Sequence, residues 1–319
     1  MGASLVDTAT VTNAGACYVL FGRTTGFPAS FNAASIIGNT GFVVTGILEE
    51  DRAGNAVGTA GDINGDGIDD MIMGVRLANP NGNSSGAAYI VYGNDQVDGF
   101  PDSFSFSDLD GSNGFTLTSG DTIRSRFGVS VNSAGDINAD GFNDVVVGTE
   151  ISGPNFSGSA YVIFGGTSGF PSLMNLTNLD GNNGFVFHGV AANNQAGRSV
   201  SGIGDINGDG LDDLIVGAPG AGINGSNSGS SYVVFGSAMA FPGVINATAL
   251  NGDNSFTING IAAEDRLGIS ASAAGDVNND GVDDMIVGAW RADPNGVTSA
   301  GSSYVVFGRI ELLFSNGFE

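Results

Sequence analysis

The sequence predicts an all-β protein of the β-propeller class, built from four-stranded antiparallel blades that recur about every 70 residues. Short β-branched and aromatic strands alternate with clusters of Gly, Asn, Pro and Ser, and helical periodicity is absent. The 54 glycines also argue against long amphipathic helices. An aspartate-rich segment returns with steps of 74, 69 and 71 residues, in copies at 61–75, 135–149, 204–218 and 275–289.

We expect four strands, named A to D in chain order, in each repeat. Strand A is Gly-centred, as in 126–135, and leads into the aspartate loop, and strand B follows that loop. Strand C ends in an aromatic residue and Gly, at 18–22, 89–93, 161–165, 232–236 and 304–308. Strand D follows a turn, at 41–46, 114–120, 184–190 and 255–261.

The chain thus holds strands C and D, three full repeats, and strands A, B and C, which makes 17 strands or about 4 to 4.5 repeats. A β-sandwich would not explain so regular a period. A solenoid of stacked repeats is the alternative architecture.

Composition narrows the classes of partner. With 319 residues, 41% of them apolar, the chain can bury a sizeable core. A net charge of −24, with nine Arg and no Lys, repels nucleic acid and anionic lipid and attracts divalent cations. No apolar stretch approaches the roughly 20 residues of a membrane helix, and the start lacks an export signal. We therefore expect no nucleic-acid partner and no membrane insertion. Cys17 stands alone in an apolar run and is expected to be buried.

Each aspartate loop has the pattern DxNxDGxxD, at 62–70, 136–144, 205–213 and 276–284. Alternate residues of a curved loop aim oxygen atoms at one centre, Gly at position 6 permits the turn, and Ca²⁺ takes 6–8 oxygen ligands. The apolar residue at position 7 would offer its carbonyl oxygen and turn its side chain into the core. The loops predict about four Ca²⁺ ions, with these ligands: Asp62, Asn64, Asp66, Ile68 and Asp70; Asp136, Asn138, Asp140, Phe142 and Asp144; Asp205, Asn207, Asp209, Leu211 and Asp213; Asp276, Asn278, Asp280, Val282 and Asp284.

Other interpretations of the loops are weaker. Mg²⁺ demands strict octahedral geometry, and Zn²⁺ would require His or Cys, of which the chain has only His188 and Cys17. Asp, Asn and Gly also form plain turns, but four copies in register argue against turns alone. An EF-hand would need Glu at position 12, where apolar strand residues stand instead: Met73, Val147, Val216 and Val287.

These residues resemble the FG-GAP repeats of the integrin α-subunit head and of many bacterial surface and secreted proteins. Phe-Gly stands at 21–22, 164–165, 235–236 and 307–308, and Gly-Ala-Pro at 217–219. The resemblance covers about residues 1–308 and implies a propeller with calcium ions in the hairpins between the two inner strands of a blade. It also implies that ligands bind the opposite face.

Chain length departs from that family. Integrin-type propellers have seven blades, and seven units would need roughly 490 residues. The chain is therefore expected to be part of a longer surface protein, extracellular or at the cell surface. In the alternative, a closed four-bladed ring, the strand at 41–46 completes the C-terminal blade. Residues 309–319 form a tail outside the repeats.

The sequence favours a binding or adhesion module over an enzyme. A single histidine, His188, supports no catalytic triad, and the absence of Lys excludes Schiff-base chemistry. Acidic residues outside the loops are expected to pair with Arg52 and Arg266 rather than to cleave glycosides: Glu49, Asp51, Glu264 and Asp265.

The loops between strands B and C vary most, and variable polar loops on a rigid scaffold commonly carry binding surfaces. We expect a protein or glycan ligand there, on the face opposite the calcium loops. Trp290 lies in one such loop, where it would either stack on a sugar ring or pack between blades. A carbohydrate-binding, lectin-like module or an accessory domain of a secreted polysaccharide-degrading enzyme is the alternative function.

Overall fold

The computed structural model describes residues 1–8, 11–24, 26–95, 100–121 and 124–309. Across these ranges the secondary structure is 21 β-strands and seven 3-10 helices of three residues each, which confirms the all-β prediction. The helices all lie in connections: η1 Ala33–Ser35, η2 Gly38–Thr40, η3 Phe106–Asp108, η4 Pro154–Phe156, η5 Leu176–Asn178, η6 Ala247–Ala249 and η7 Pro294–Gly296.

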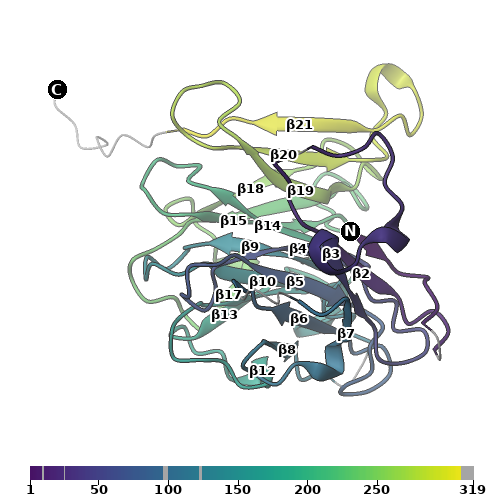
Figure 1. The fold of residues 1–319 in the computed structure, drawn as a ribbon. Coiled ribbons are helices and arrows are strands. Elements are labelled where there is room, and N and C mark those ends of the chain that lie inside the picture. The colour runs from purple at the N-terminus through teal and green to yellow at the C-terminus, as the bar shows by residue number, and fades with distance from the viewer. Residues whose placement is uncertain (9–10, 25, 96–99, 122–123, 310–319) are drawn as a thin grey trace, which may run out of the picture. The chain divides into compact units, whose positions relative to one another are not determined.

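The chain divides into two compact units, and the first consists of Met1–Asn132 and Gly165–Asn178. It holds two sheets, in the orders β1-β2-β3-β7 and β4-β5-β6-β8-β12 (Figure 1). Their strands are β1 Gly2–Ala3, β2 Ala16–Leu20, β3 Gly41–Thr45, β4 Ala56–Gly61, β5 Asp70–Val75, β6 Ala87–Val91, β7 Ser103–Ser105, β8 Gly114–Thr118 and β12 Leu173–Asn175.

The second unit consists of Ser133–Phe164 and Leu179–Glu319. Its sheets have the orders β9-β10-β11-β13-β17, β14-β15-β16-β18 and β19-β20-β21. Their strands are β9 Ser130–Gly135, which begins before the unit boundary, β10 Asp144–Thr149, β11 Ser159–Ile163, β13 Gly184–His188, β14 Ser199–Gly204, β15 Asp213–Ala218, β16 Ser230–Val234, β17 Val244–Asn246, β18 Ser255–Asn259, β19 Leu267–Gly275, β20 Asp284–Ala289 and β21 Ser302–Val306.

The 17 predicted strands all occur, in the predicted order A to D and with antiparallel pairing of successive strands. Strand C stops short of the aromatic-Gly pair, as β16 does at Val234. The four additional strands are β1, β7, β12 and β17. In β1, Gly2 and Ala3 pair with β2 as Gly217 and Ala218 pair with β16, so β1 occupies the place where a B strand ends.

The core lies around strands B and C, most completely in the sheets that contain β10–β11 and β15–β16. Every residue of β10, β11, β15 and β16 is buried, because these strands are covered on both faces. The first aromatic residue of strand D completes this core, and Phe42, Phe115 and Phe185 are fully buried. Continuous burial of short apolar strands explains why they read as unbroken Val, Ile and Leu runs in the sequence.

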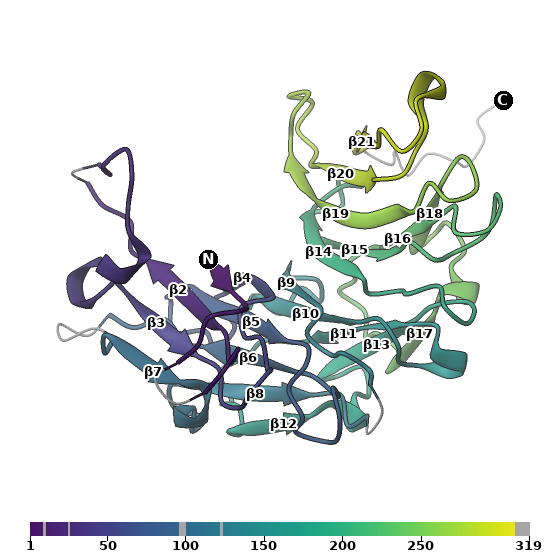
Figure 2. The same cartoon turned by 90° about the vertical axis from the view of Figure 1, so that its right-hand side faces the viewer.

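A Phe-Pro pair in the connection between strands C and D builds a feature that we call the clasp. The connection reaches strand D of the preceding sheet, where β7, β12 and β17 pair in parallel with β3, β8 and β13. Figures 1 and 2 show this arrangement for β12 beside β8. The clasp phenylalanines stack on the first Phe of the covered strand, with ring centroids 4.0, 4.4 and 4.8 Å apart in Phe100–Phe42, Phe170–Phe115 and Phe241–Phe185.

The pairing of β3 contradicts the four-bladed alternative. In that arrangement the strand at 41–46 would complete the C-terminal blade, beside β21. Both edges of β3 are instead occupied within its own sheet, by β2 and by the clasp strand β7. Among the described residues, β21 pairs with β20 alone.

Candidate functional site

The four aspartate loops are the hairpin turns between strands A and B: β4–β5, β9–β10, β14–β15 and β19–β20. Glycine at position 6 has a left-handed backbone in each loop, with φ between 87° and 91°. This conformation disfavours any residue with a Cβ atom, which explains the invariant Gly of the pattern. Position 4 is left-handed as well, yet it is Ala139 in one loop and Asn279 in another.

Side chains at positions 1, 3 and 5 face the interior of the loop. In the third loop, Asp205 accepts hydrogen bonds from the main-chain N–H groups of Asp209 at 3.0 Å and Gly210 at 2.7 Å. Asp209 in turn accepts from the N–H of Leu211 at 2.9 Å and from the amide of Asn207 at 2.9 Å. The corresponding contacts recur in the other three loops. The backbone donors therefore gather the carboxylate oxygens around one turn.

The aspartate at position 9 is buried, and it fixes the loop to the end of strand C. The two carboxylate oxygens of Asp213 accept from the N–H groups of Ile206 at 3.0 Å and Gly236 at 2.8 Å. Gly236 is the glycine of the aromatic-Gly pair, and a Cβ atom there would lie 2.5 Å from the carbonyl oxygen of Asp212. This close approach gives a physical reason for the recurring glycine. Asp70 and Asp284 make the same bridge to Gly93 and Gly308.

Burial and neighbouring negative charge raise the pKa of two position-9 carboxyl groups, those of Asp70 and Asp213. Burial contributes most and raises the pKa of Asp70 to about 6 and that of Asp213 to about 7. The loop carboxylates add to the increase, whereas the main-chain N–H donors oppose it. A cation in the loop would relieve this repulsion.

Position 8, which the sequence analysis did not single out, links neighbouring loops. The carboxylate of Asp212 accepts from the N–H of Asp136 at 2.8 Å, and that of Asp283 accepts from the N–H of Asp205 at 3.1 Å. The N–H of Asp283 also donates to the carbonyl of Asp205 at 3.2 Å. An acidic residue stands at this position in three of the four loops, as Asp69, Asp212 and Asp283, and this recurrence was the available signal.

The side chains at position 7 are buried to different extents in the four loops. Ile68, Phe142 and Leu211 are only half-buried, and Val282 alone is buried. The apolar side chain at position 2 is buried more consistently than that at position 7, and three isoleucines there are buried: Ile63, Ile137 and Ile206. Position 2 precedes the sharp turn, so its side chain still lies on the face of strand A that packs into the core.

The donor set suits a hard cation. Each loop offers three carboxylates, one amide oxygen and one main-chain carbonyl, and lacks the nitrogen or sulfur ligands that zinc favours. Within the described part of the chain, no three His, Cys, Asp or Glu side chains lie close enough together to hold a metal ion. The calcium ligands therefore stay a prediction, based on their chemistry and the loop conformation.

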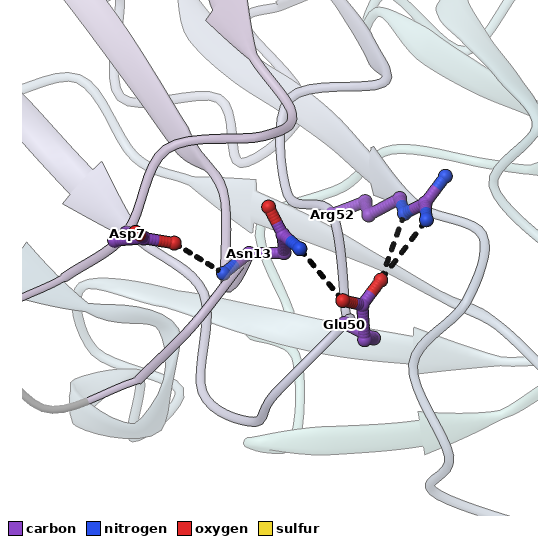
Figure 3. Close-up of polar contacts among 4 residues, drawn as sticks. All are labelled: Asp7, Asn13, Glu50 and Arg52. Carbon is purple, nitrogen blue, oxygen red and sulfur yellow. Dashed lines mark hydrogen bonds and ion pairs between the residues drawn. The ribbon is translucent and has the colours of Figure 1, made fainter.

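At the opposite end of the blades, connections B–C and D–A are tied together by polar contacts. Figure 3 shows Asn13 donating to Glu50 at 2.6 Å, and Arg52 forming an ion pair with the same carboxylate at 2.9 Å. The backbone N–H of Asn13 also donates to Asp7 at 2.8 Å. The equivalent amide, that of Asn227, donates to Glu264 at 3.0 Å.

The predicted ion pairs are thus only partly correct. Arg52 pairs with Glu50, not with Glu49 or Asp51, and Arg266 has no acidic partner within 4.0 Å in the described residues. Asp51 and Asp265 are buried, and each accepts the N–H of the residue three positions earlier, at 2.8 Å. These carboxylates therefore shape the turns that contain them.

Three single residues have clear surroundings. His188 Nδ1 lies 2.8 Å from the Ser159 hydroxyl, the same cross-strand pair that Asn259 and Ser230 form at 2.8 Å, so its role is structural. Trp290 is 53% exposed, with the Arg291 guanidinium 4.9 Å from its ring. Cys17 is buried, which raises the pKa of its thiol to about 12.

Comparison with known proteins agrees with this geometry. The FG-GAP repeat model matches residues 53–91, 127–163, 196–234 and 268–306, so each match contains one aspartate loop and ends within strand C. No described helix is long and apolar enough to span a membrane.

The similar proteins include integrin α-subunits. Integrin alpha pat-2 of Caenorhabditis elegans is 40% identical over 99 residues, which is 31% of this chain and 8% of the relative. Integrin alpha-5 of Xenopus laevis is 28% identical over 169 residues, 50% of this chain and 14% of the relative. Phosphatidylinositol-glycan-specific phospholipase D of Bos taurus is 32% identical over 179 residues, 54% of this chain and 19% of the relative. The matched region is thus less than a fifth of each relative's length.

Proposed function

This chain is an FG-GAP repeat protein with the integrin-α-like propeller fold, and on that premise we propose that it is a calcium-binding, extracellular module for adhesion or ligand binding. The observation that carries the proposal is the fourfold repetition of the inward-facing DxNxDGxxD loop in the same hairpin. One Ca²⁺ per loop would draw on the five ligands named above and would neutralise carboxylates that otherwise repel each other.

The ligand surface is proposed to be the end of the blades opposite the aspartate loops. Connections B–C and D–A meet there, and their polar contacts, such as Asn13–Glu50 and Asn227–Glu264, hold variable loops in defined positions. Rigid presentation lowers the entropy cost of binding. The negative charge of the chain favours a partner with basic or neutral surface.

An extracellular location fits the metal chemistry. Extracellular calcium modules commonly bind with dissociation constants of about 10⁻⁴–10⁻³ M, and this range is useful only where calcium is millimolar. Similarity to integrin α-subunits supports the same location.

Carbohydrate binding is the second candidate, and the exposed Trp290 favours it. The indole ring is accessible, and the adjacent Arg291 guanidinium could donate to sugar hydroxyls beside a stacked ring. An accessory role beside a secreted enzyme domain is consistent with the similarity to a phospholipase D.

A binding screen separates these candidates. The full chain is immobilised and exposed to a glycan array and to a panel of extracellular-matrix proteins, in millimolar calcium and in excess chelator. We expect calcium-dependent capture of a protein ligand that Trp290→Ala leaves unchanged. Capture of glycans that Trp290→Ala abolishes would replace adhesion with the lectin-like function, and ligand capture unaffected by chelator would contradict the calcium-dependent module.

A further inference from the structure

Two position-8 aspartates make their side-chain contacts outside the loops that contain them. Asp212 belongs to the third aspartate loop, and its carboxylate accepts the main-chain N–H of Asp136, the first residue of the second loop. Asp283 belongs to the fourth loop and accepts the N–H of Asp205, the first residue of the third. Among the described residues, neither carboxylate accepts a hydrogen bond from its own loop. Each of these loops thus supplies a carboxylate to the loop of the preceding repeat.

The first two residues of the second loop are held by the repeat that follows. The position-1 N–H donates to Asp212 at 2.8 Å, and the position-2 carbonyl, that of Ile137, accepts from the N–H of Ser237 at 2.9 Å. The third loop has the same two contacts, with Asp283 at 3.1 Å and the N–H of Arg309 at 2.9 Å as the partners. Both contacts act on the point where strand A enters the loop.

The glycine before each of these two loops makes room for the carboxylate. Gly135 and Gly204 have left-handed backbones, with φ of 73° and 70°. A Cβ atom on Gly135 would collide with the Asp212 carboxylate, and one on Gly204 would collide with that of Asp283. Gly275, before the fourth loop, has a similar φ of 66°, yet a Cβ there would meet no described atom within 4 Å beyond its chain neighbours. The close approach is therefore a property of the two bridged loops.

Position 1 is the residue that organises the turn of each loop. In the second loop, the carboxylate of Asp136 accepts the N–H groups of Asp140 at 3.0 Å and Gly141 at 2.9 Å. Asp205 has the equivalent contacts in the third loop. A neighbour that fixes the backbone of position 1 thus restrains the turn that gathers the proposed ligand oxygens. Restraint before binding lowers the ordering cost of binding, and rigidity is one of the factors that set calcium affinity.

We propose that Asp212 and Asp283 are positioning residues for calcium, each of which raises the affinity of the preceding loop and not that of its own loop. The inference rests on the proposed function, because it concerns loops that are proposed to bind Ca²⁺. Asp212 acts on the second loop and Asp283 on the third, by holding the position-1 N–H. Removing either carboxylate therefore weakens a calcium site to which that residue contributes no ligand.

A calcium titration of the full-length chain, followed by NMR at the position-6 glycine amides, tests the proposal. These amides report the second, third and fourth loops separately, as Gly141, Gly210 and Gly281. In Asp212→Ala the dissociation constant read at Gly141 should rise at least ~5-fold, while those read at the other two glycines change by less than ~2-fold. In Asp283→Ala the rise should appear at Gly210 instead. An unchanged Gly281 in both variants shows that the fold is intact.

Two matched variants separate the hydrogen bond from the loss of negative charge. Asp69, at position 8 of the first loop, is exposed and accepts no hydrogen bond among the described residues. Asp69→Ala should therefore change the affinity of its own loop, read at Gly67, by less than ~2-fold. Asp212→Asn loses the charge but keeps an acceptor oxygen, so the affinity read at Gly141 should return to within ~2-fold of wild type.

A second pair of variants displaces the carboxylate without removing it. Gly204→Ala places a Cβ atom against the Asp283 carboxylate, whereas Gly275→Ala introduces the same backbone strain with open space around it. The rise in dissociation constant that Gly204→Ala causes at Gly210 should exceed the rise that Gly275→Ala causes at Gly281 by at least ~5-fold.

An unchanged Gly141 in Asp212→Ala would overturn the proposal. Weakening that is equal in all loops, or greatest in the loop that carries the substitution, would overturn it in favour of a general effect of charge. A calcium response in wild type without this crossed pattern would remove the inference and leave the proposed function in place. The absence of any calcium response in the wild-type chain would overturn both.

Discussion

Buried carboxylates in this chain are held by main-chain N–H groups far more than by arginines. Asp213 has two such donors and Asp265 has one, whereas the buried Glu150 pairs with Arg198 at 3.2 Å. With nine Arg against 33 acidic residues, most acidic side chains must find other partners. The DxNxDGxxD pattern predicted the residue types at the loops. It did not predict the burial of Asp51, because that depends on which connection folds over it.

Asp51→Asn tests whether the buried carboxylate of this turn lowers the stability of the folded chain. Burial raises the pKa of Asp51, and one of its oxygens has no hydrogen-bond partner. Because the folded-state pKa lies above the unfolded value, the contribution of Asp51 to stability is present at low pH and is lost as pH rises through the folded pKa. Asn194 stands at the same position of another repeat and accepts the equivalent N–H at 2.8 Å, so Asn is compatible with the turn.

The free energy of unfolding of Asp51→Asn is expected to equal or exceed that of wild type by up to about 1 kcal/mol at pH 7. Denaturant unfolding at pH 4 and at pH 7 measures it, and the advantage of the variant should be smaller at pH 4. The contrary result is a loss of stability in Asp51→Asn that is larger at pH 7 than at pH 4. It would show that the ionised carboxylate stabilises the fold.

Two asparagine substitutions in the third loop separate calcium ligation from architecture. Asp209 is exposed at position 5, so Asp209→Asn should weaken calcium binding yet change stability in chelator by less than about 0.5 kcal/mol. Asp213 accepts two N–H groups in a buried position, so Asp213→Asn turns a donor toward one of them. It should cost about 1–3 kcal/mol even in chelator.

Calorimetric calcium titration and chelator-state denaturation, applied to both variants, give the comparison. Equal losses of stability in chelator would show that the position-5 carboxylate is also part of the folded framework. Unchanged calcium binding in Asp209→Asn would remove that residue from the ligand set.

At the scale of elements, strand order and type were predictable and the clasps were not. Repetition located all 17 principal strands, since β-branched and aromatic segments recur in one order between clusters of turn residues. The clasp strands are three residues long and polar in part, such as Ser103–Ser105, and their pairing with a distant strand D has no local signal. The recurring Phe-Pro pair is the feature of the sequence that marks each clasp. Its role is visible only in the structure, where the Phe ring stacks on strand D.

Phe241→Ala measures what one clasp contributes. The Phe241 ring is buried against Phe185, so its removal should lower the free energy of unfolding by about 3 kcal/mol. Phe27 occupies the same Phe-Pro pair in the first connection but is 51% exposed, with its ring 5.6 Å from the Arg23 guanidinium. Phe27→Ala is therefore the matched control and should cost no more than about 0.5 kcal/mol. Similar losses in both variants, measured by denaturant unfolding, would contradict a stabilising role specific to the clasp.

At the scale of the whole molecule, a repeated four-stranded unit carries a repeated aspartate loop. The fold class followed from the period and the composition, because a regular unit of four strands leaves few architectures. The links between neighbouring loops through Asp212 and Asp283 and the covered edges of strand D could not follow from local patterns. They depend on contacts between residues about 70 positions apart, which the periodicity permits but does not specify.

Calcium binding by the full-length chain tests the central claim most directly. Isothermal titration should count about four ions, which would change the formal charge from −24 to −16. The melting temperature should rise by many degrees between excess chelator and millimolar calcium, since each site adds about 2.7 kcal/mol when calcium is 100-fold above its Kd. No binding heat together with an unchanged melting temperature would contradict the account, and the aspartate loops would then be turns that stabilise the hairpins without a metal ion.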